Sequence, residues 1–167
     1  MIKLFASLLF ILPLTFVNAQ AKLDTSNYAI IKFELSNPHP FGNKYKAAEL
    51  ELSEIIEAEN ILSICANNYN KLQMLRYNEI IKRNPKSKSR PKIASLVIDL
   101  PRYKRQYVAV INSKGEKEIW INCFCTNFGI DWRHTIVNVD DGGNCFFNVR
   151  VNLTTKQYFN FMVNGYA

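Results

Sequence analysis

The stretch Asn144-Cys145-Phe146-Phe147-Asn148-Val149-Arg150-Val151-Asn152-Leu153 decides the fold class, because its side chains change character at every second residue. Apolar side chains at positions 145, 147, 149, 151 and 153 alternate with polar ones at 144, 148, 150 and 152. Successive side chains of a strand point to opposite faces of a sheet, so this pattern predicts a strand with one buried and one polar face. Residues 135–139 and the turn sequence Asp140-Asp141-Gly142-Gly143 predict that this strand closes a hairpin.

Other segments show the same strand character. Residues 28–35 alternate, with Ala29, Ile31, Phe33 and Leu35 on one side. Residues 107–111 and 119–125 flank a loop in which Gly115 suits a hairpin. Residues 158–163 supply a last strand, in which the alternation turns 159, 161 and 163 inward and leaves Tyr158 on the outer face.

One long helix precedes these strands. From Ala47 the apolar period changes from two to about 3.6, with residues 55, 58, 62, 65, 69 and 72 on one face. The helical pattern continues until Pro85 ends it. We therefore expect an α+β fold, in which a long amphipathic helix packs on an antiparallel β-meander sheet. This shape is similar to that of cystatins and nuclear transport factors, and such scaffolds host inhibitors, binding modules and enzymes alike.

Several C-terminal motifs carry a narrower resemblance. The segments 103–112, 120–125 and 141–147 and the closing Val163-Asn164-Gly165-Tyr166-Ala167 resemble a set of small secreted bacterial proteins with no known activity. The resemblance covers roughly the C-terminal 40% of the chain. It implies a shared fold and export, and no function is carried over from it.

Composition and the N-terminus indicate an exported globular protein. The chain has 167 residues, of which 48% are hydrophobic and 13% aromatic, which excludes a disordered or collagen-like chain. Lys3, the apolar run 4–16 and Val17-Asn18-Ala19 have the form of a secretory signal. We expect a signal peptide over 1–19, a flexible N-terminus over 20–27 and a single domain over 28–167. The mature protein would be periplasmic or extracellular, without a transmembrane segment.

Four cysteines in an exported chain are candidates for disulfides. Cys65 falls on the apolar helix face, and the strand alternation places Cys123, Cys125 and Cys145 on the buried sheet face, so all four are expected in the helix–sheet interface. Residues i and i+2 of one strand are too far apart for a bridge, which disfavours Cys123–Cys125. Two double pairings stay open, Cys65–Cys123 with Cys125–Cys145 and Cys65–Cys125 with Cys123–Cys145, as does a single bridge beside two buried thiols.

Two groups of residues are candidates for a chemical site. Cys123, Cys125, Cys145 and His134 could form a zinc set, but structural zinc sites use longer spacers between paired cysteines. Asp131, His134 and Asp140 could supply acid–base chemistry for a hydrolase. The sequence contains neither a glycine-rich phosphate loop nor a Gly-x-Ser-x-Gly or His-Glu-x-x-His motif. We therefore predict no catalytic residue, no metal site and no cofactor.

Positive charge is concentrated in one segment, residues 82–105, which carries nine basic residues against Asp99 alone and so has a net charge of +8. Exposed aromatic residues beside positive charge can form a binding surface, and we expect the outward strand faces to expose Trp120, Phe124, Phe146 and Tyr158. The predicted binding patch comprises Lys82, Arg83, Lys86, Lys88, Arg90, Lys92, Arg102, Lys104, Arg105, Trp120 and Phe124.

The function predicted from these features is that of an exported, non-enzymatic binding domain. Its basic patch would meet an anionic envelope component or a protein partner, and no nucleic acid is expected as a partner of an exported protein. The alternative is a hydrolase or metal-binding protein that uses His134 with nearby acids or cysteines.

Overall fold

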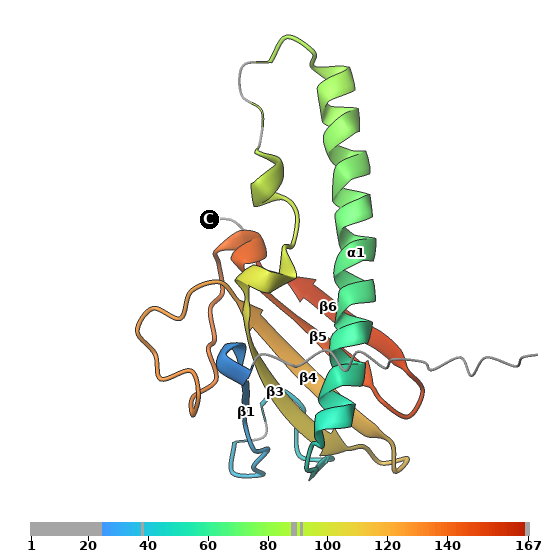
Figure 1. The fold of residues 1–167 in the computed structure, drawn as a ribbon, viewed down its shortest axis with the longest axis vertical. Coiled ribbons are helices and arrows are strands. Elements are labelled where there is room, and N and C mark those ends of the chain that lie inside the picture. The colour runs from blue at the N-terminus through green and yellow to red at the C-terminus, as the bar shows by residue number, and fades with distance from the viewer. Residues whose placement is uncertain (1–24, 38, 88–89, 91, 166–167) are drawn as a thin grey trace, which may run out of the picture.

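A twisted sheet with one long helix across a single face organises the molecule (Figure 1). The computed structural model describes residues 25–37, 39–87, 90 and 92–165. The strands are β1 (Tyr28–Ile30), β2 (Lys46–Ala47), β3 (Lys104–Ile111), β4 (Lys117–Phe124), β5 (Phe146–Asn152) and β6 (Gln157–Val163), and the helix is α1 (Leu52–Arg83). Short 3₁₀ turns occupy Thr25–Asn27, Ile93–Ser95, Leu100–Arg102 and Gly143–Cys145.

The predicted α+β class is confirmed, but the sheet is mixed rather than a pure meander. Its order is β1-β3-β4-β5-β6, and β2 pairs with β3 beyond the end of β1. The strands β3 to β6 pair antiparallel in sequence order, whereas β1 runs parallel to β3. The strand predicted over 28–35 is shorter in the structure, because only the three residues of β1 pair with β3. The chain after Ile31 continues as a loop over the sheet.

The hairpin predicted from residues 135–139 is wrong. The strand β5 pairs with β4 instead, and residues 125–142 form an irregular loop across the sheet face opposite α1. The alternation that suggested a strand arises because Val137 and Val139 pack inward from this loop, Val137 being buried. The turn glycine keeps its role, since Gly142 has φ +94° and a Cβ there would lie 2.7 Å from the Phe146 ring.

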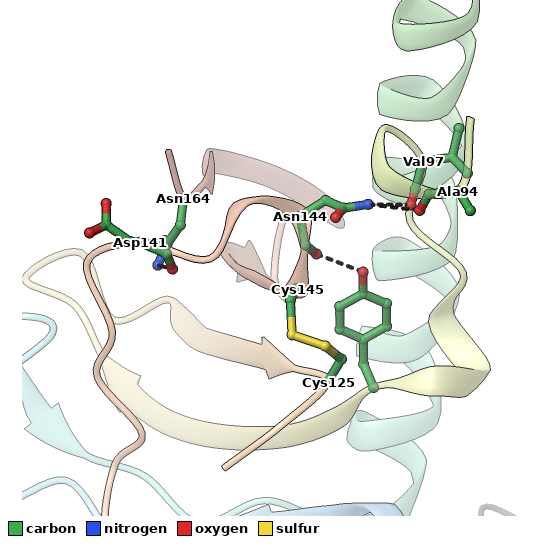
Figure 2. Close-up of a disulfide and its surroundings, with 8 residues drawn as sticks. Ala94, Val97, Cys125, Asp141, Asn144, Cys145 and Asn164 are labelled. Carbon is green, nitrogen blue, oxygen red and sulfur yellow. Dashed lines mark hydrogen bonds between the residues drawn. A yellow bond between two sulfur atoms is a disulfide. The ribbon is translucent and has the colours of Figure 1, made fainter. Parts of the chain in front are cut away.

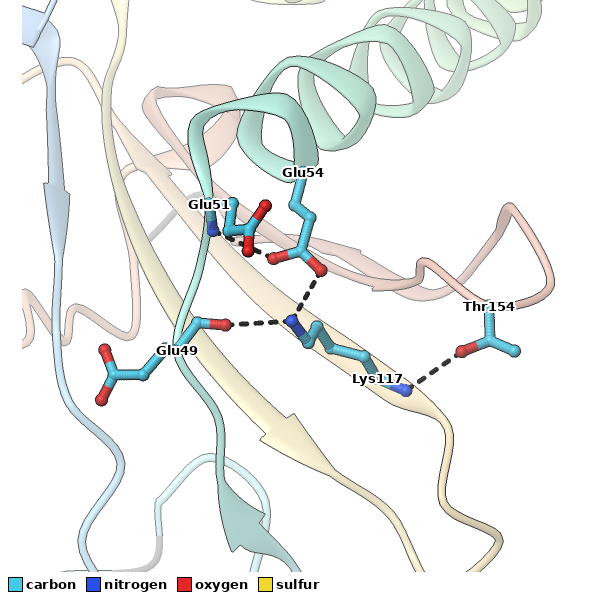
Figure 3. Close-up of polar contacts among 5 residues, drawn as sticks. All are labelled: Glu49, Glu51, Glu54, Lys117 and Thr154. Atoms are coloured by element: carbon cyan, nitrogen blue, oxygen red, sulfur yellow. Dashed lines mark hydrogen bonds and ion pairs between the residues drawn. The ribbon is translucent and has the colours of Figure 1, made fainter.

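The helix starts at Leu52, not at Ala47, because Lys46 and Ala47 pair with β3 as strand β2. Glu54 accepts a hydrogen bond from the Glu51 N–H at 3.0 Å and so caps the first turn (Figure 3). The same carboxylate pairs with Lys117 Nζ at 2.6 Å, and Lys117 also donates to the Glu49 carbonyl at 3.1 Å. One lysine of β4 thereby fixes the start of α1 to the sheet.

The inner core lies between α1 and the sheet. Only the first half of the helix contributes buried residues, the last of which is Ala66. A polar group bridges this interface: Glu59 of α1 forms an ion pair with Arg105 Nε at 2.9 Å and accepts a hydrogen bond from the Tyr107 hydroxyl. Because Tyr107 is fully buried, the contacts of Glu59 with Arg105 and Tyr107 fix the position of α1 against β3.

The outer face of the sheet is covered by loops, which two buried amides hold in place. Gln106 of β3 donates to the carbonyls of Trp132 at 2.6 Å and Thr135 at 2.7 Å, and it accepts from the Val137 N–H at 2.9 Å. Asn122 of β4 donates to the Val137 carbonyl at 2.7 Å and to Gln106 Oε1 at 3.1 Å. The loop has no strand partners, so its backbone N–H and C=O groups form hydrogen bonds with side chains of the sheet instead.

A bulge in β6 changes the predicted alternation there. Arg150 pairs with Phe159 and Asn148 with Met162, so β6 holds one residue more than β5 between these pairs. The extra residue, Asn160, has φ +50°. Tyr158 therefore packs on the inner core, and Phe159 pairs with the outward Arg150, which reverses the orientation that strict alternation predicts for both.

We predict that the Glu54–Lys117 pair makes stability depend on pH. Burial acts to raise the pKa of Glu54, but the Glu51 N–H and the Lys117 ammonium outweigh it and hold that pKa below its ordinary value. A lowered folded-state pKa gives stability that is present above the unfolded pKa of 4.5 and lost as the pH falls through the folded one. Lys117→Ala should therefore cost roughly 1 kcal/mol at pH 7 and much less at about pH 2 in urea unfolding. An equal cost at both pH values would contradict the prediction.

We predict that Gln106→Leu destabilises the fold by about 3 kcal/mol, because it leaves two buried backbone groups and one partly buried backbone group of the loop without their partner. Urea unfolding followed by tryptophan fluorescence measures this, since Trp132 lies in the loop that is released. The matched control is Gln157→Leu on the exposed edge of β6, which should change stability by less than about 0.5 kcal/mol. Equal effects of the two substitutions would show that the amide does not hold the loop.

Candidate functional site

The second half of α1 and the chain that returns from it extend beyond the sheet (Figure 1). We call residues 71–97 the basic arm. The arm has a defined base, because Asn70 Nδ2 donates to the Ile98 carbonyl at 2.7 Å and Asn70 Oδ1 accepts from the Ile98 N–H at 2.7 Å. This pair of hydrogen bonds ties the returning chain to the helix where the arm leaves the sheet.

A second anchor joins the arm to the end of the sheet (Figure 2). Asn144 Nδ2 donates to the Val97 carbonyl at 2.6 Å, and the Tyr103 hydroxyl donates to the Asn144 carbonyl at 2.6 Å. The next residue, Cys145, forms a disulfide with Cys125. The turn that holds the arm is therefore itself covalently fixed.

The arm carries the net charge of the whole chain. Its sequence contains eight lysines and arginines against Glu79 alone, which gives +7, equal to the +7 of all 167 residues. The remainder of the chain is thus neutral overall. Glu79 is paired with Arg83 at 3.8 Å on the surface, an interaction that contributes little stability.

One side of the helix combines this charge with exposed apolar groups. Ile64, Lys71, Leu75 and Lys82 are spaced by seven, four and seven residues and so lie along one helical face. Ile64 is 56% exposed and Leu75 is 62% exposed. Leu72, which the sequence pattern places on the buried face, is exposed too, because the sheet ends before it.

The predicted basic patch is divided by the structure. Its residues 82–92 lie on the arm, where all those described are exposed, and Lys88 lies outside the described residues. Arg102 is exposed near the base, and Lys104 lies over the Trp132 ring at 5.1 Å. Arg105 is only 11% exposed and is held by Glu59, so its charge belongs to the core rather than to a surface.

The predicted aromatic part of that patch is covered. Trp120 and Phe124 do lie on the outer face of the sheet, but both are buried. Phe124 contacts Trp132 of the 125–142 loop edge to face, and Trp120 contacts His39 in the same way. Phe146 is also buried there, so the expectation of an exposed aromatic face is wrong. The loops that contain His39 and Trp132 are long enough to cover this face, and their length is the sequence signal that could have indicated it.

The cysteines follow the single-bridge alternative. Cys125 and Cys145 form the disulfide, whereas Cys65 and Cys123 are free and buried in the helix–sheet core. The expectation that all four lie in that interface is wrong for the bridged pair, since β4 ends at Phe124 and Cys125 is exposed beyond it. Within the described residues no group of three or more histidine, cysteine and acidic side chains is placed to hold a metal ion, so the zinc set is not assembled.

The histidine proposed for acid–base chemistry has one of its expected partners. His134 Nδ1 lies 2.9 Å from Asp131 Oδ2, and the two side chains are 80% and 68% exposed. This hydrogen bond and the nearby Arg133 hold the pKa of Asp131 below its ordinary value. Asp140 lines a different hollow, so the three residues do not form one site.

A cleft that the sequence analysis missed opens on the outer face of the sheet. It has a volume of about 520 Å³ and lies between residues 137–140 of the loop and strands β5 and β6. The alternation of β5 correctly predicts that Asn148 and Arg150 point outward, but a strand over 135–139 would leave no cleft beside them.

No helix among the described residues is both long and apolar enough to cross a membrane.

We predict that the two free thiols resist alkylation in the native protein. Burial raises the pKa of the Cys65 thiol to about 12 and raises that of Cys123 as well, so neither forms the reactive thiolate at pH 8. Iodoacetamide followed by peptide mass mapping should label neither residue until urea is added. After reduction of the native protein, Cys125 should be labelled first because it is exposed. Rapid native labelling of Cys65 or Cys123, or a second disulfide, would contradict this prediction.

No protein-family model, curated protein or solved structure matches this chain. The resemblance of its C-terminal motifs to small secreted bacterial proteins therefore stays a prediction from the sequence. What the protein does has to be inferred from the basic arm, the outer cleft and their chemistry.

Proposed function

We propose that this protein is an exported binding domain that docks on an anionic membrane surface through its basic arm. The observation that carries this proposal is the concentration of the entire +7 net charge in the arm, beside exposed aliphatic side chains. Anionic headgroups attract such a charge before contact, and lysine and arginine near the surface each contribute about 1 kcal/mol.

The outward helix face supplies the second part of the interaction. Ile64 and Leu75 alternate along it with Lys71 and Lys82. A helix that lies in the headgroup region buries apolar side chains while its lysines reach the phosphates. This combination favours a lipid surface over an acidic protein, because a purely charged partner leaves the leucine and isoleucine exposed.

The cysteine chemistry supports the proposed export. Disulfides persist in oxidising compartments, and the Cys125–Cys145 bridge stabilises the turn that holds the base of the arm. In such a compartment a membrane surface is available to the arm and nucleic acid is not its expected partner. Neither the arm nor its anchors involve the exposed Asp131–His134 pair.

The test is sedimentation with vesicles of phosphatidylcholine that contain phosphatidylglycerol or lack it. The full-length mature protein should bind the anionic vesicles at low salt and dissociate as salt is added. Lys71→Ala/Lys82→Ala should weaken partitioning roughly thirtyfold, which corresponds to about 1 kcal/mol for each lysine. The matched control is Lys44→Ala/Lys114→Ala, which removes two exposed lysines outside the arm and should change binding far less.

A second pair of variants tests the apolar part. Leu75→Ser should weaken binding several-fold, whereas Leu35→Ser, at a leucine that is 63% exposed outside the arm, should not. Circular dichroism establishes that all variants are folded. Absence of binding to anionic vesicles, or equal losses in the arm and control variants, would refute membrane docking. Binding that is confined to acidic proteins would refute it too.

A further inference from the structure

The outer cleft is lined by asparagine side chains that come from separate parts of the chain. The strands β4, β5 and β6 contribute Asn122, Asn148 and Asn160. The 125–142 loop contributes Asn138, and the chain after β6 contributes Asn164. The volume of about 520 Å³ is within the range of small-molecule sites. Each amide offers an acceptor oxygen and two N–H donors, so the walls can both donate and accept hydrogen bonds.

The bulge in β6 brings one of these amides to the cleft. Asn160 is the extra residue between the pairs Arg150–Phe159 and Asn148–Met162, and it joins Met162 in lining the cleft. Its φ of +50° is a left-handed conformation that asparagine tolerates better than most residues. Bulges at a sheet edge re-aim side chains in this way beside binding sites.

Existing hydrogen bonds orient three of the amides. Asn122 uses both of its N–H donors on Gln106 and Val137, whereas Asn148 and Asn164 each keep an unused polar group. Asn148 Oδ1 accepts from the Trp120 indole N–H at 3.2 Å, which leaves the Asn148 amino group as a donor. Asn164 Nδ2 donates to the carbonyls of Val139 and Asp141, which leaves Asn164 Oδ1 as an acceptor. Asn138 and Asn160 are exposed and make no side-chain hydrogen bond to the part of the chain that the structure describes. The cleft therefore presents oriented donors and acceptors.

The charge in the cleft is small. Arg150 lies on one wall, but its guanidinium donates to the Pro40 carbonyl at 2.6 Å and stacks 4.6 Å from the Phe41 ring centre. Asp140 and His39 are the other titratable groups among the lining residues that the structure describes. Met162, which is 62% exposed, adds apolar surface, whereas Trp120 is buried at the floor of the cleft. These features suit a ligand that is neutral, rich in hydroxyl groups and partly apolar on its faces.

We infer that the outer cleft binds a neutral oligosaccharide. Sugar hydroxyls both donate and accept hydrogen bonds, which matches the asparagine amides, and the C–H face of a sugar ring can pack on the exposed Met162 side chain. An extended peptide is the competing ligand, since β6 pairs on one side only within the part of the chain that the structure describes. The bulge at Asn160 disfavours it, because strand addition needs regular backbone spacing along the edge.

The experiment is a ¹H–¹⁵N NMR titration of the mature protein with two neutral sugars, triacetylchitotriose and maltotriose. At least one of these sugars should shift the side-chain NH₂ signals of Asn148 and Asn160, with saturation in the millimolar range or below. Asn160→Gly removes the amide and keeps the left-handed backbone, and it should weaken binding at least fivefold. The matched control is Lys156→Gly, at a residue with φ +57° outside the cleft, which should bind like the unaltered protein.

A further variant keeps the test decisive if Asn160→Gly fails to fold. Asn138→Ala changes an exposed loop residue and should also weaken sugar binding severalfold. The inference is overturned if neither sugar shifts these signals, if both cleft variants bind as the control does, or if only an extended peptide produces the shifts. None of these residues belongs to the basic arm, so this result is independent of the vesicle experiment.

Discussion

The buried amide of Gln106 determines what the outer half of this molecule can be. A sheet face covered by an irregular loop must find partners for the backbone N–H and C=O groups of that loop. Gln106 uses both of its N–H donors and its carbonyl oxygen for this purpose, and Asn122 adds a bond to the same segment. This loop is held by side chains and not by strand pairing. Residues 137–140 of the loop can therefore lie apart from β5 and β6, which leaves the cleft between them.

The inner half depends on a different constraint, namely the match between helix and sheet. Glu59, Arg105 and Tyr107 fix α1 across β3, and the sheet covers the helix as far as Ala66. The seventeen residues that follow to Arg83 extend about 25 Å at the rise of an α-helix. The basic arm therefore results from a helix that is longer than the sheet it packs on, and the asparagine contacts at its base set where it begins.

Much of this architecture could be predicted from the sequence, and the errors have physical causes. Alternation located β5 correctly, because every second residue from Phe147 to Val151 is buried. The hairpin of β3 and β4 was also predicted, since its loop contains Gly115. Alternation failed at Val137 because a loop that packs on a sheet can bury every second residue too. It failed at Phe159 because one bulged residue reverses the two faces of a strand.

The candidate sites were harder to predict because they depend on which distant segments of the chain lie side by side in the fold. The basic residues 82–92 were identified from charge alone, since nothing buries them. Trp120 and Phe124 were misjudged, because local sequence does not reveal that two distant loops meet over them. The asparagines of the cleft are separated by up to 42 positions, from Asn122 to Asn164, and only the folded sheet brings them together.

The division of charge between the two surfaces links them physically. Because the arm carries all of the net charge, the electrostatic field of the molecule is centred on one end, and an anionic surface attracts that end first. The cleft lies on the outer face of the sheet, in the part of the chain that is neutral overall. A neutral ligand is therefore not repelled or attracted by the field that guides the arm. The two proposed interactions can occur on one molecule together, since they share no residue and rely on different forces.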